Sequence, residues 1–422
     1  MILVESCCGQ NSNLGDEAIL SANLHFLLEK KCKVIVLSGK PEQTSKLHGV
    51  KAEQGFAALT KTPNRIRRRF RVIWLAFRLV LASKILEKTG RTCLLNKKEL
   101  NFLQLFRSCK ALLIVGGGFF RDGLFWVSND ISGAFPKGIA VLLAKTFKKP
   151  VYLGAQTLGP LRKWYHKLFC QIILRKADFL CVREPFSVET AKKLGFPFNP
   201  KITIDDAFNV ESTNEKRAKE LLLDEGINID EVKKKEMLIG FSSRGLGTKN
   251  EELREKALDF LRRLLKKGGI HILVIPTMYG DQHKRYIEEA EKISGKTEIR
   301  SKITFLMNKY TYRDVKSFFS LTEATVAISF HSAVFALSSN VPAIGLYENE
   351  YYKMKLKGMF MILGFEGYAL EVHEATLDEI YSKFDELIRN RFEIREYLSQ
   401  KTGDLSTNCC LAAKLISKYH CA

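Results

Sequence analysis

Short apolar runs rich in β-branched residues alternate with helical patterns along almost the whole chain. A strand of a parallel sheet is buried on both faces and reads as such a run, and the crossover to its neighbour reads as a helix. We therefore expect an α/β fold in which helices cover both faces of parallel sheets. The expected strands span residues 2–5, 33–37, 111–115, 151–154, 178–182, 202–204, 237–242, 270–275, 303–306, 325–330 and 342–346.

A charge-rich segment, residues 211–236, separates the strands into two series. A chain of 422 residues is long enough to build two full cores. We predict an N-terminal doubly wound domain at 1–210, a charged linker at 211–236 and a second doubly wound domain at 237–375. Helices at 376–422 are expected to pack back across both domains. Two such domains should face a cleft, with ligands bound beyond the carboxyl ends of the strands.

The composition limits the partners and the compartment. A net charge of +21 and a pI near 9.5 predict attraction to an anionic partner. No sequence signature of a nucleic-acid-binding fold accompanies this charge, so nucleic acid is not the expected partner. The ten cysteines form no CxxC pair, and no signal-peptide pattern or membrane-spanning apolar run is present. We expect a cytoplasmic protein with reduced thiols.

The N-terminal stretch GQNSNLGDEAIL joins the first strand to a helix. Asn13 and Gly15 lie in the tight connection, and Asp16 and Glu17 lie in the first turn or at the cap. One interpretation is an ordinary capped turn, and the other is a ligand-facing loop at a helix N-terminus. The residues of this stretch alone leave both interpretations open.

Two further connections of the first half are rich in glycine. Gly116, Gly117 and Gly118 follow strand 111–115, and they complete neither a dinucleotide-binding fingerprint nor a P-loop. Gln156 lies in a similar turn and offers hydrogen-bonding groups. A ligand role and a tight turn are both compatible with these patterns. Arg183 ends strand 178–182, where we favour a pairing with Glu184 or a neighbouring helix.

The second half carries two candidate residues at strand ends. Arg244 follows strand 237–242 between serines and glycines, a setting that suits a phosphate or carboxylate. His331 and Ser332 follow strand 325–330 and begin a helix of small residues. A histidine at a helix N-terminus beside a cleft is placed for acid–base work or for binding an anion.

Taken together, these motifs resemble the polysaccharide pyruvyltransferase family. They occur in the family's order and cover residues 2 to about 365. The matching stretches are N-L-G-D-E at 13–17, G-G-G-F at 116–119, G-A-Q-T-L-G-P at 154–160, V-R-E-x-x-S at 182–187, K-K-L-G at 192–195, D-D-A-F at 205–208, H-S-A-V-F-A at 331–336 and P-A-I-G-L-Y at 342–347.

The resemblance implies two Rossmann-like domains of glycosyltransferase-B type, with the acceptor on the N-terminal side and the donor on the C-terminal side. It also implies transfer of the enolpyruvyl unit of phosphoenolpyruvate to two hydroxyls of a sugar, giving a pyruvate ketal and phosphate. The family's donor arginine corresponds to Arg244, and its Arg-x-His pair corresponds to Ser329 and His331. Since Ser329 replaces the arginine, another cation is expected there. The candidates are Arg121, Arg183, Lys353 and Lys355.

The same resemblance suggests a role for each candidate. His331 is the expected acid, or the group that stabilises phosphate, while Asp16 or Glu17 is the expected base. Arg244, His331, Ser332, Ser329 and Lys353 are the expected donor-binding residues. Asn13, Gly15, Gly117, Gly118 and Gln156 are the expected acceptor-binding residues. We expect neither a metal nor a cofactor, with phosphoenolpyruvate as co-substrate.

A nucleotide-sugar glycosyltransferase on the same fold is the alternative. It would also bind a diphosphate with a cation, and Glu348 or Glu350 would hold the ribose. Stabilisation by phosphoenolpyruvate but not by nucleotide sugars would distinguish the two functions.

Residues 62–90 combine aromatic and basic residues at helical spacing. An apolar face runs along this helix, and Arg65, Arg67, Arg68, Arg69 and Arg71 crowd its first turns. The apolar face is formed by Ile66, Phe70, Ile73, Trp74, Phe77, Val80 and Leu81. Packing into the domain core is one interpretation. The other is an interfacial helix that binds anionic lipid, which suits an enzyme acting on lipid-diphosphate-linked glycans at the inner membrane face.

Overall fold

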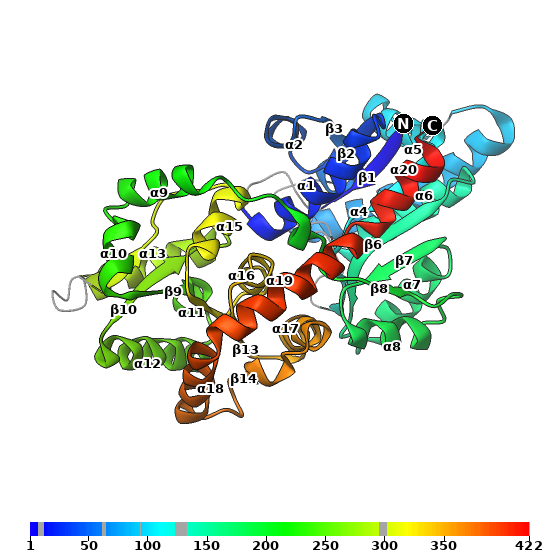
Figure 1. Cartoon of the computed structure of the whole chain (residues 1–422). Coiled ribbons are helices and arrows are strands. Elements are labelled where there is room, and N and C mark those ends of the chain that lie inside the picture. The colour runs from blue at the N-terminus through cyan, green and yellow to red at the C-terminus, as the bar shows by residue number, and fades with distance from the viewer. Residues whose placement is uncertain (7–11, 61–64, 93, 123–132, 295–301, 422) are drawn as a thin grey trace. The chain divides into compact units, whose positions relative to one another are not determined.

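The computed structural model describes residues 1–6, 12–60, 65–92, 94–122, 133–294 and 302–421 (Figure 1). The chain forms two compact units, each with its own parallel sheet. Unit 1 comprises Met1–Gln10, Ile19–Asp206 and Cys409–Ala422. Unit 2 comprises Asn11–Ala18 and Ala207–Asn408. The N-terminal turn around Asn13 therefore belongs to unit 2, although the strand before it belongs to unit 1.

The sheet of unit 1 has the order β3-β2-β1-β4-β6-β7-β8, and β5 pairs with β6 beside this path. All of these pairs are parallel, and Ile2 of β1 aligns with both Val34 of β2 and Ala111 of β4. The strands are β1 Ile2–Glu5, β2 Val34–Ser38, β3 Lys51–Gln54, β4 Ala111–Ile114, β5 Gly117–Phe120, β6 Val151–Leu158, β7 Phe179–Val182 and β8 Lys201–Ile202. The central β1, β2 and β4 are buried along their whole length, which explains their continuous apolar sequences.

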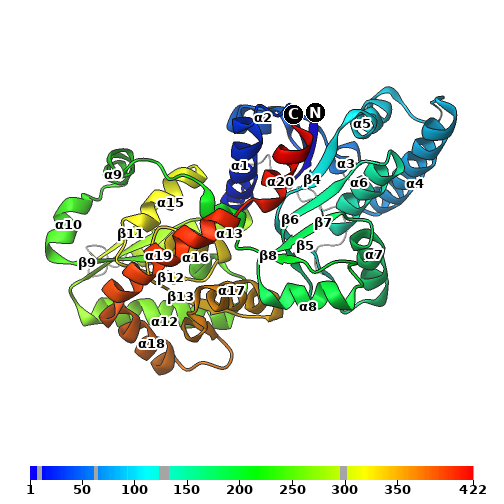
Figure 2. The ribbon, with the colours of Figure 1, turned by 45° about the vertical axis from the view of Figure 1, so that its right-hand side comes forward.

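The helices of unit 1 cover both faces of this sheet. They are α1 Leu14–Glu29, α2 Pro41–His48, α3 Phe56–Leu59, α4 Arg65–Thr89, α5 Lys97–Ser108, α6 Ala134–Thr146, α7 Trp164–Leu174, α8 Pro185–Lys193 and α20 Leu411–His420. The crossovers from β3 to β4, β4 to β6 and β6 to β7 all step in one direction across the sheet. Because parallel crossovers are right-handed, their helices α4–α7 lie on one face. Figure 2 shows α4, α6 and α7 next to one another.

The sheet of unit 2 has the order β11-β10-β9-β12-β13-β14. Its neighbouring strands are also parallel. The strands are β9 Met237–Ser242, β10 Ile270–Ile275, β11 Ile303–Phe305, β12 Ala324–Ala327, β13 Ala343–Tyr347 and β14 Ala369–Glu371. The strand order reverses direction between β9 and β12. In doubly wound sheets, such a reversal opens the crevice where ligands bind.

The strands expected from apolar runs are confirmed, and three short strands were not predicted. β3 reads KAEQ, β5 reads GGFF and β14 reads ALE, so none shows a β-branched run. β3 lies at the edge of its sheet, where exposed polar side chains are tolerated.

The prediction that residues 211–236 form a linker is wrong. They include α9 Glu215–Asp224 and α10 Ile229–Lys235, both in unit 2. Ala218, Leu222 and Ile229 are buried. The high charge of this segment reflects the solvent-exposed sides of two amphipathic helices. The N-terminal part of unit 1 ends at Asp206, whereas the first domain was predicted to end at residue 210.

The remaining helices of unit 2 surround its sheet. They are α11 Arg244–Gly247, α12 Glu251–Lys267, α13 Asp281–Ser294, α15 Tyr312–Ser320, α16 Phe330–Leu337, α17 Glu350–Leu363, α18 Leu377–Arg389 and α19 Arg391–Asn408. The tail predicted as one group of helices divides between the units, since α18 and α19 belong to unit 2 and α20 belongs to unit 1. No described helix is both long and apolar enough to cross a bilayer.

The prediction of uniformly reduced cysteines is also wrong. Cys32, after α1, forms a disulfide with Cys421, after α20. The two cysteines are 389 residues apart in the sequence, so spacing gave no sign of the pairing. The disulfide joins both ends of unit 1. Cys109, Cys170, Cys181, Cys409 and Cys410 are buried free thiols.

Candidate functional site

The carboxyl ends of three neighbouring strands of unit 2 are joined by hydrogen bonds. Ser242 ends β9, and its Oγ accepts a 3.2 Å hydrogen bond from the backbone N–H of Ser329. The Oγ of Ser329 lies 2.9 Å from Oγ1 of Thr277, which follows β10. Ser329 follows β12 and is the N-cap of α16. The candidate site therefore lies at the topological switch point of this sheet.

The N-terminal turn pairs with the same region. The backbone N–H of Leu14 donates to Thr277 O at 3.2 Å, and Tyr279 N–H donates to Ser12 O at 2.6 Å. Asn13 and Met278 form an antiparallel bridge. Residues 13–17 were predicted to belong to the N-terminal domain, and this prediction is wrong: they belong to unit 2. Backbone pairing, which has no sequence signature here, makes this segment part of unit 2.

Gly15 packs against the imidazole of His331. A Cβ atom at residue 15 would stand 1.9 Å from Nδ1 of His331. His331 is largely buried, and its ring contacts those of Phe330 and Phe335 with centroid separations of 5.2 and 6.4 Å. The glycine of the N-L-G-D-E motif is therefore required by the close approach of a histidine about 300 residues away along the chain.

The two candidate carboxylates beside Gly15 differ in accessibility. Asp16 is partly exposed, and its Oδ2 accepts a 2.8 Å hydrogen bond from Nδ2 of Asn13. Glu17 is buried. The side chain of Asn13 therefore orients the carboxylate of Asp16 at the start of α1. Of the two carboxylates, only Asp16 is accessible to a substrate.

Arg244 is held by three groups of unit 2. Its Nη1 donates to Ile328 O at 3.0 Å, its Nη2 pairs with Glu348, and its guanidinium carbon lies 4.0 Å from the ring centre of Tyr352. Ile328 lies three residues before His331 in the sequence, so this hydrogen bond brings Arg244 close to the start of α16. The guanidinium is therefore fixed beside α16, and Glu348 occupies one side of its donor fork.

Ser329 occupies the position of the family arginine, and it has a structural role in this chain. Ser329 caps α16 by accepting from the backbone N–H of Ser332 at 3.2 Å. The hydroxyl of the buried Ser332 donates to Ser329 O at 2.6 Å. An arginine at residue 329 would lack the short hydroxyl that makes this cap.

The four candidate replacements for that arginine occupy different surroundings. Lys355 is buried, with Nζ 4.4 Å from the ring centre of Phe330, the residue between Ser329 and His331. Lys353 faces another way and lies 3.6 Å from Glu371. Arg121 and Arg183 belong to unit 1. Within unit 2, Lys355 is the candidate closest to the site.

The glycine-rich connections of unit 1 are closely packed. A Cβ on Gly116 would lie 2.6 Å from Ala155 O, and one on Gly117 would lie 2.1 Å from the ring of Phe119. Gly117 and Gly118 lie in β5. Gln156 is fully buried, and its Nε2 donates to Val115 O at 2.9 Å. These contacts give the glycines and Gln156 a packing role in unit 1.

Polar residues from several motifs of unit 1 form a buried network that was not predicted from the sequence. Arg183 binds Asp205 and donates from Nε to Thr157 Oγ1 at 2.9 Å. Asp205 is a partner of Arg183 that the sequence interpretation, which favoured Glu184 or a neighbouring helix, did not include. Asp206 accepts from Nδ2 of Asn23 at 2.9 Å and from the backbone N–H of Cys410 at 2.7 Å. Burial raises the pKa of Asp206 to about 6.

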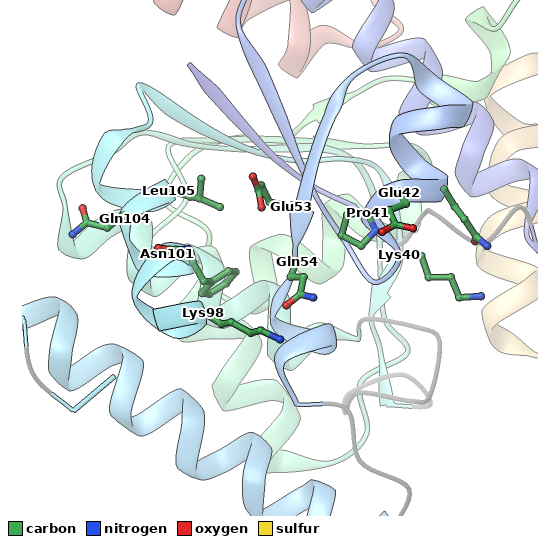
Figure 3. Close-up of a pocket in the computed structure, with 11 residues that line it drawn as sticks. Lys40, Pro41, Glu42, Glu53, Gln54, Lys98, Asn101, Gln104 and Leu105 are labelled. Atoms are coloured by element: carbon green, nitrogen blue, oxygen red, sulfur yellow. The ribbon is translucent and has the colours of Figure 1, made fainter. Parts of the chain in front are cut away.

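A separate cavity of about 810 Å³ lies in unit 1 (Figure 3). The labelled side chains come from α2, from the end of β3 and from α5, and they are mostly amides, carboxylates and lysines. The lining residues are Lys40, Pro41, Glu42, Gln43, Glu53, Gln54, Lys98, Asn101, Phe102, Gln104 and Leu105. None of the predicted site residues lines this cavity.

Three solved structures resemble the whole chain in fold. The S. aureus MnaA structure with UDP has a TM-score of 0.56 at 13% identity, covering 98% of this chain and 94% of that chain. The UDP-GlcNAc 2-epimerase of Neisseria meningitidis bound to UDP-GlcNAc scores 0.55 at 12% identity, covering 99% and 98%. The UDP-forming α,α-trehalose-phosphate synthase of Burkholderia vietnamiensis scores 0.54 at 10% identity, covering 100% and 98%. The fold is therefore a pair of Rossmann-like domains of glycosyltransferase-B type.

A sequence profile described as polysaccharide pyruvyl transferase matches residues 13–350. The chain belongs to this family, and the resemblance seen in its motifs is confirmed. The amylovoran biosynthesis protein AmsJ of Erwinia amylovora is 22% identical over 306 residues, which cover 71% of this chain and 70% of that protein. The protein is thus a transferase of the polysaccharide pyruvyl transferase family.

Proposed function

We propose that this protein transfers the pyruvyl group of phosphoenolpyruvate to two hydroxyls of a sugar in a cell-surface polysaccharide or its lipid-linked repeat unit. The observation that carries the proposal is the convergence of Arg244, His331 and the N-terminus of α16 at the switch point of unit 2. Phosphoenolpyruvate carries a phosphate and a carboxylate. A guanidinium and the positive end of a helix dipole are suited to attract two such anions.

The chemistry requires one proton donor and one proton acceptor. Protonation of the methylene carbon of phosphoenolpyruvate makes C2 electrophilic, and the first sugar hydroxyl adds there with loss of its proton. The second hydroxyl then displaces phosphate from C2, and its proton leaves with the phosphate. The products are the pyruvate ketal and inorganic phosphate, so atoms and charges balance without any oxidant or metal.

Two groups of unit 2 are suited to these proton transfers. His331 is the proposed acid, because imidazole can donate a proton near neutral pH. Asp16 is the proposed base, because it is partly exposed and adjoins Gly15, which contacts His331. Burial of Glu17 makes it the weaker candidate. We assign the charge of the missing family arginine to Lys355, which packs on Phe330.

We further propose that the protein acts on its acceptor at the inner membrane face, with α4 in contact with anionic lipid. α4 buries one face through Val72, Leu75 and Leu79. Its opposite face leaves Phe70 72% and Trp74 60% exposed. Helix α4 therefore packs in the core through a different face from the apolar face named in the sequence. The described residues of that named face are exposed, apart from the half-buried Val80, and offer an aromatic surface to a membrane. The side chains of Arg65 and Ile66, also named in the sequence, lie outside the described residues.

The catalytic proposal is tested by mass spectrometry of candidate glycans after incubation with phosphoenolpyruvate, together with a phosphate-release assay. A pyruvate ketal formed with one phosphate per transfer is expected, and Arg244→Ala and His331→Ala should abolish it. Thermal stabilisation by a nucleotide sugar but not by phosphoenolpyruvate would instead support a glycosyltransferase, and would overturn the proposal.

A further inference from the structure

Helix α7 carries a second exposed apolar stripe on the same face of unit 1 as α4. Trp164, Leu168 and Ile172 recur every four residues, so they line one side of the helix. Their exposed fractions are 72%, 48% and 44%, and the neighbouring Tyr165 is 43% exposed. The opposite side of α7, which includes Cys170 and Ile173, is buried.

Helices α4 and α7 both pack on α6, which lies between them (Figure 2). Phe169 of α7 stacks on Phe135 of α6 with ring centres 5.4 Å apart. A Cβ on Gly138 of α6 would lie 2.3 Å from the ring of Phe169, so this glycine lets α7 approach closely. Helices α4 and α7 belong to right-handed crossovers and therefore lie on the same face of the sheet. The sides of both helices that do not pack on the sheet point away from that face.

Cations predominate among the charges around the two stripes, although Glu87 of α4 is also exposed. Residues 162–176 contain five exposed cations and no aspartate or glutamate. These cations are Arg162, Lys163, Lys167, Arg175 and Lys176. On α4, Arg67, Arg69, Arg71, Lys84 and Lys88 are exposed. Tryptophan and tyrosine beside cations are typical of surfaces that enter the headgroup region of an anionic bilayer.

We propose that α4 and α7 form one docking surface for an anionic membrane, with Trp74 and Trp164 inserted together. This surface, called the α4/α7 face, consists of Phe70, Ile73, Trp74, Phe77 and Leu81 of α4 and Trp164, Tyr165, Leu168 and Ile172 of α7. The inference rests on the membrane contact of α4 proposed above and extends it to a second helix. Insertion of two helices restricts the orientation of the protein on the bilayer, because two separated contacts limit its rotation about either one.

Flotation with vesicles of phosphatidylcholine mixed with phosphatidylglycerol tests the α4/α7 face. The full chain should float with these vesicles at low salt and stay down with pure phosphatidylcholine. Trp164→Ser combined with Leu168→Ser should weaken vesicle binding by about tenfold, since two large side chains no longer insert. The exposed Phe392 of α19 in unit 2 supplies the matched control, and Phe392→Ser should float like the original protein.

Tryptophan fluorescence tests the inference without the serine substitutions, which could impair folding. The chain has three tryptophans, at 74, 126 and 164. In the Trp74→Phe, Trp126→Phe variant, the emission of Trp164 should shift to shorter wavelength when anionic vesicles are added. Unshifted emission, or full binding by the α7 variant, would overturn the two-helix surface while leaving the α4 contact intact. Failure of the original protein to bind would overturn both proposals, and neither result depends on pyruvyl transfer.

Discussion

Gly15 and His331 occupy adjoining space in unit 2, where a Cβ at residue 15 would overlap the imidazole 1.9 Å from Nδ1. Gly15→Ala must therefore displace His331. A misplacement of about 1 Å at a reacting group can lower activity about 100-fold. We expect a loss of this order in transfer rate, measured as phosphate released from phosphoenolpyruvate.

A matched glycine separates this effect from helix propensity. Gly403 lies inside α19, and no atom lies within 4 Å of where its Cβ would be. Gly403→Ala should leave transfer unchanged, since it only adds helix propensity. Equal activity of the Gly15 and Gly403 variants would show that His331 does not need its present position.

Glu348 competes with an anionic donor for the guanidinium of Arg244. The two side chains form an ion pair, and both are mostly buried. Glu348→Gln removes the competing charge, so calorimetry should show phosphoenolpyruvate binding more tightly, by up to about tenfold. Glu350→Gln removes the same charge two residues further on and should leave the affinity unchanged. Weaker binding by Glu348→Gln would instead show that Glu348 positions Arg244 for the donor.

The N-cap formed by Ser329 leads to a prediction about stability that can be tested without an activity assay. Ser329→Ala and Ser329→Arg both remove the hydroxyl that accepts from Ser332 N–H. Each should lower the free energy of unfolding by about 1 kcal/mol, whereas Ser329→Asn should retain the cap. Denaturant unfolding measures the difference. Full stability of the arginine variant would show that the family residue fits this position without cost.

Burial of Glu184 predicts a pH-dependent stability. Desolvation at the start of α8 raises the pKa of Glu184 to about 7. Between about pH 4.5 and about pH 7, the Glu184 carboxyl is therefore protonated in the folded chain and ionised in the unfolded chain. The free energy of unfolding falls as the pH rises through this range. Glu184→Gln should gain melting temperature relative to the original protein between about pH 5 and about pH 8.

The exposed Glu189 on the same helix is the control for this pH effect. It pairs with Lys193 at 2.8 Å, and this hydrogen bond lowers the pKa of Glu189. Glu189 is therefore ionised throughout that pH range, and Glu189→Gln should show a constant difference in melting temperature. A constant difference for Glu184→Gln as well would mean that Glu184 is ionised in the folded protein across the same range.

The class of fold could be predicted from local sequence patterns. Buried parallel strands require continuous apolar runs, and crossover helices require a helical period, so both signals are local. Arg244 and His331 could be singled out for the same reason, since each directly follows a strand whose carboxyl end is visible in the sequence. The ordered motifs also sufficed to indicate the family that the profile later matched.

Which distant segments share a unit depends on contacts in space that no local pattern reveals. The turn at Asn13 pairs by backbone hydrogen bonds with Thr277–Tyr279, and such bonds are available to any sequence. The disulfide between Cys32 and Cys421, and the pairing of Arg183 with Asp205, likewise depend on distance in space rather than on local pattern. Gly15 illustrates the division: the strand-to-helix junction around it was readable from the sequence, but the structure places Gly15 in the first turn of α1, and its requirement for glycine comes from the ring of His331 packed against it.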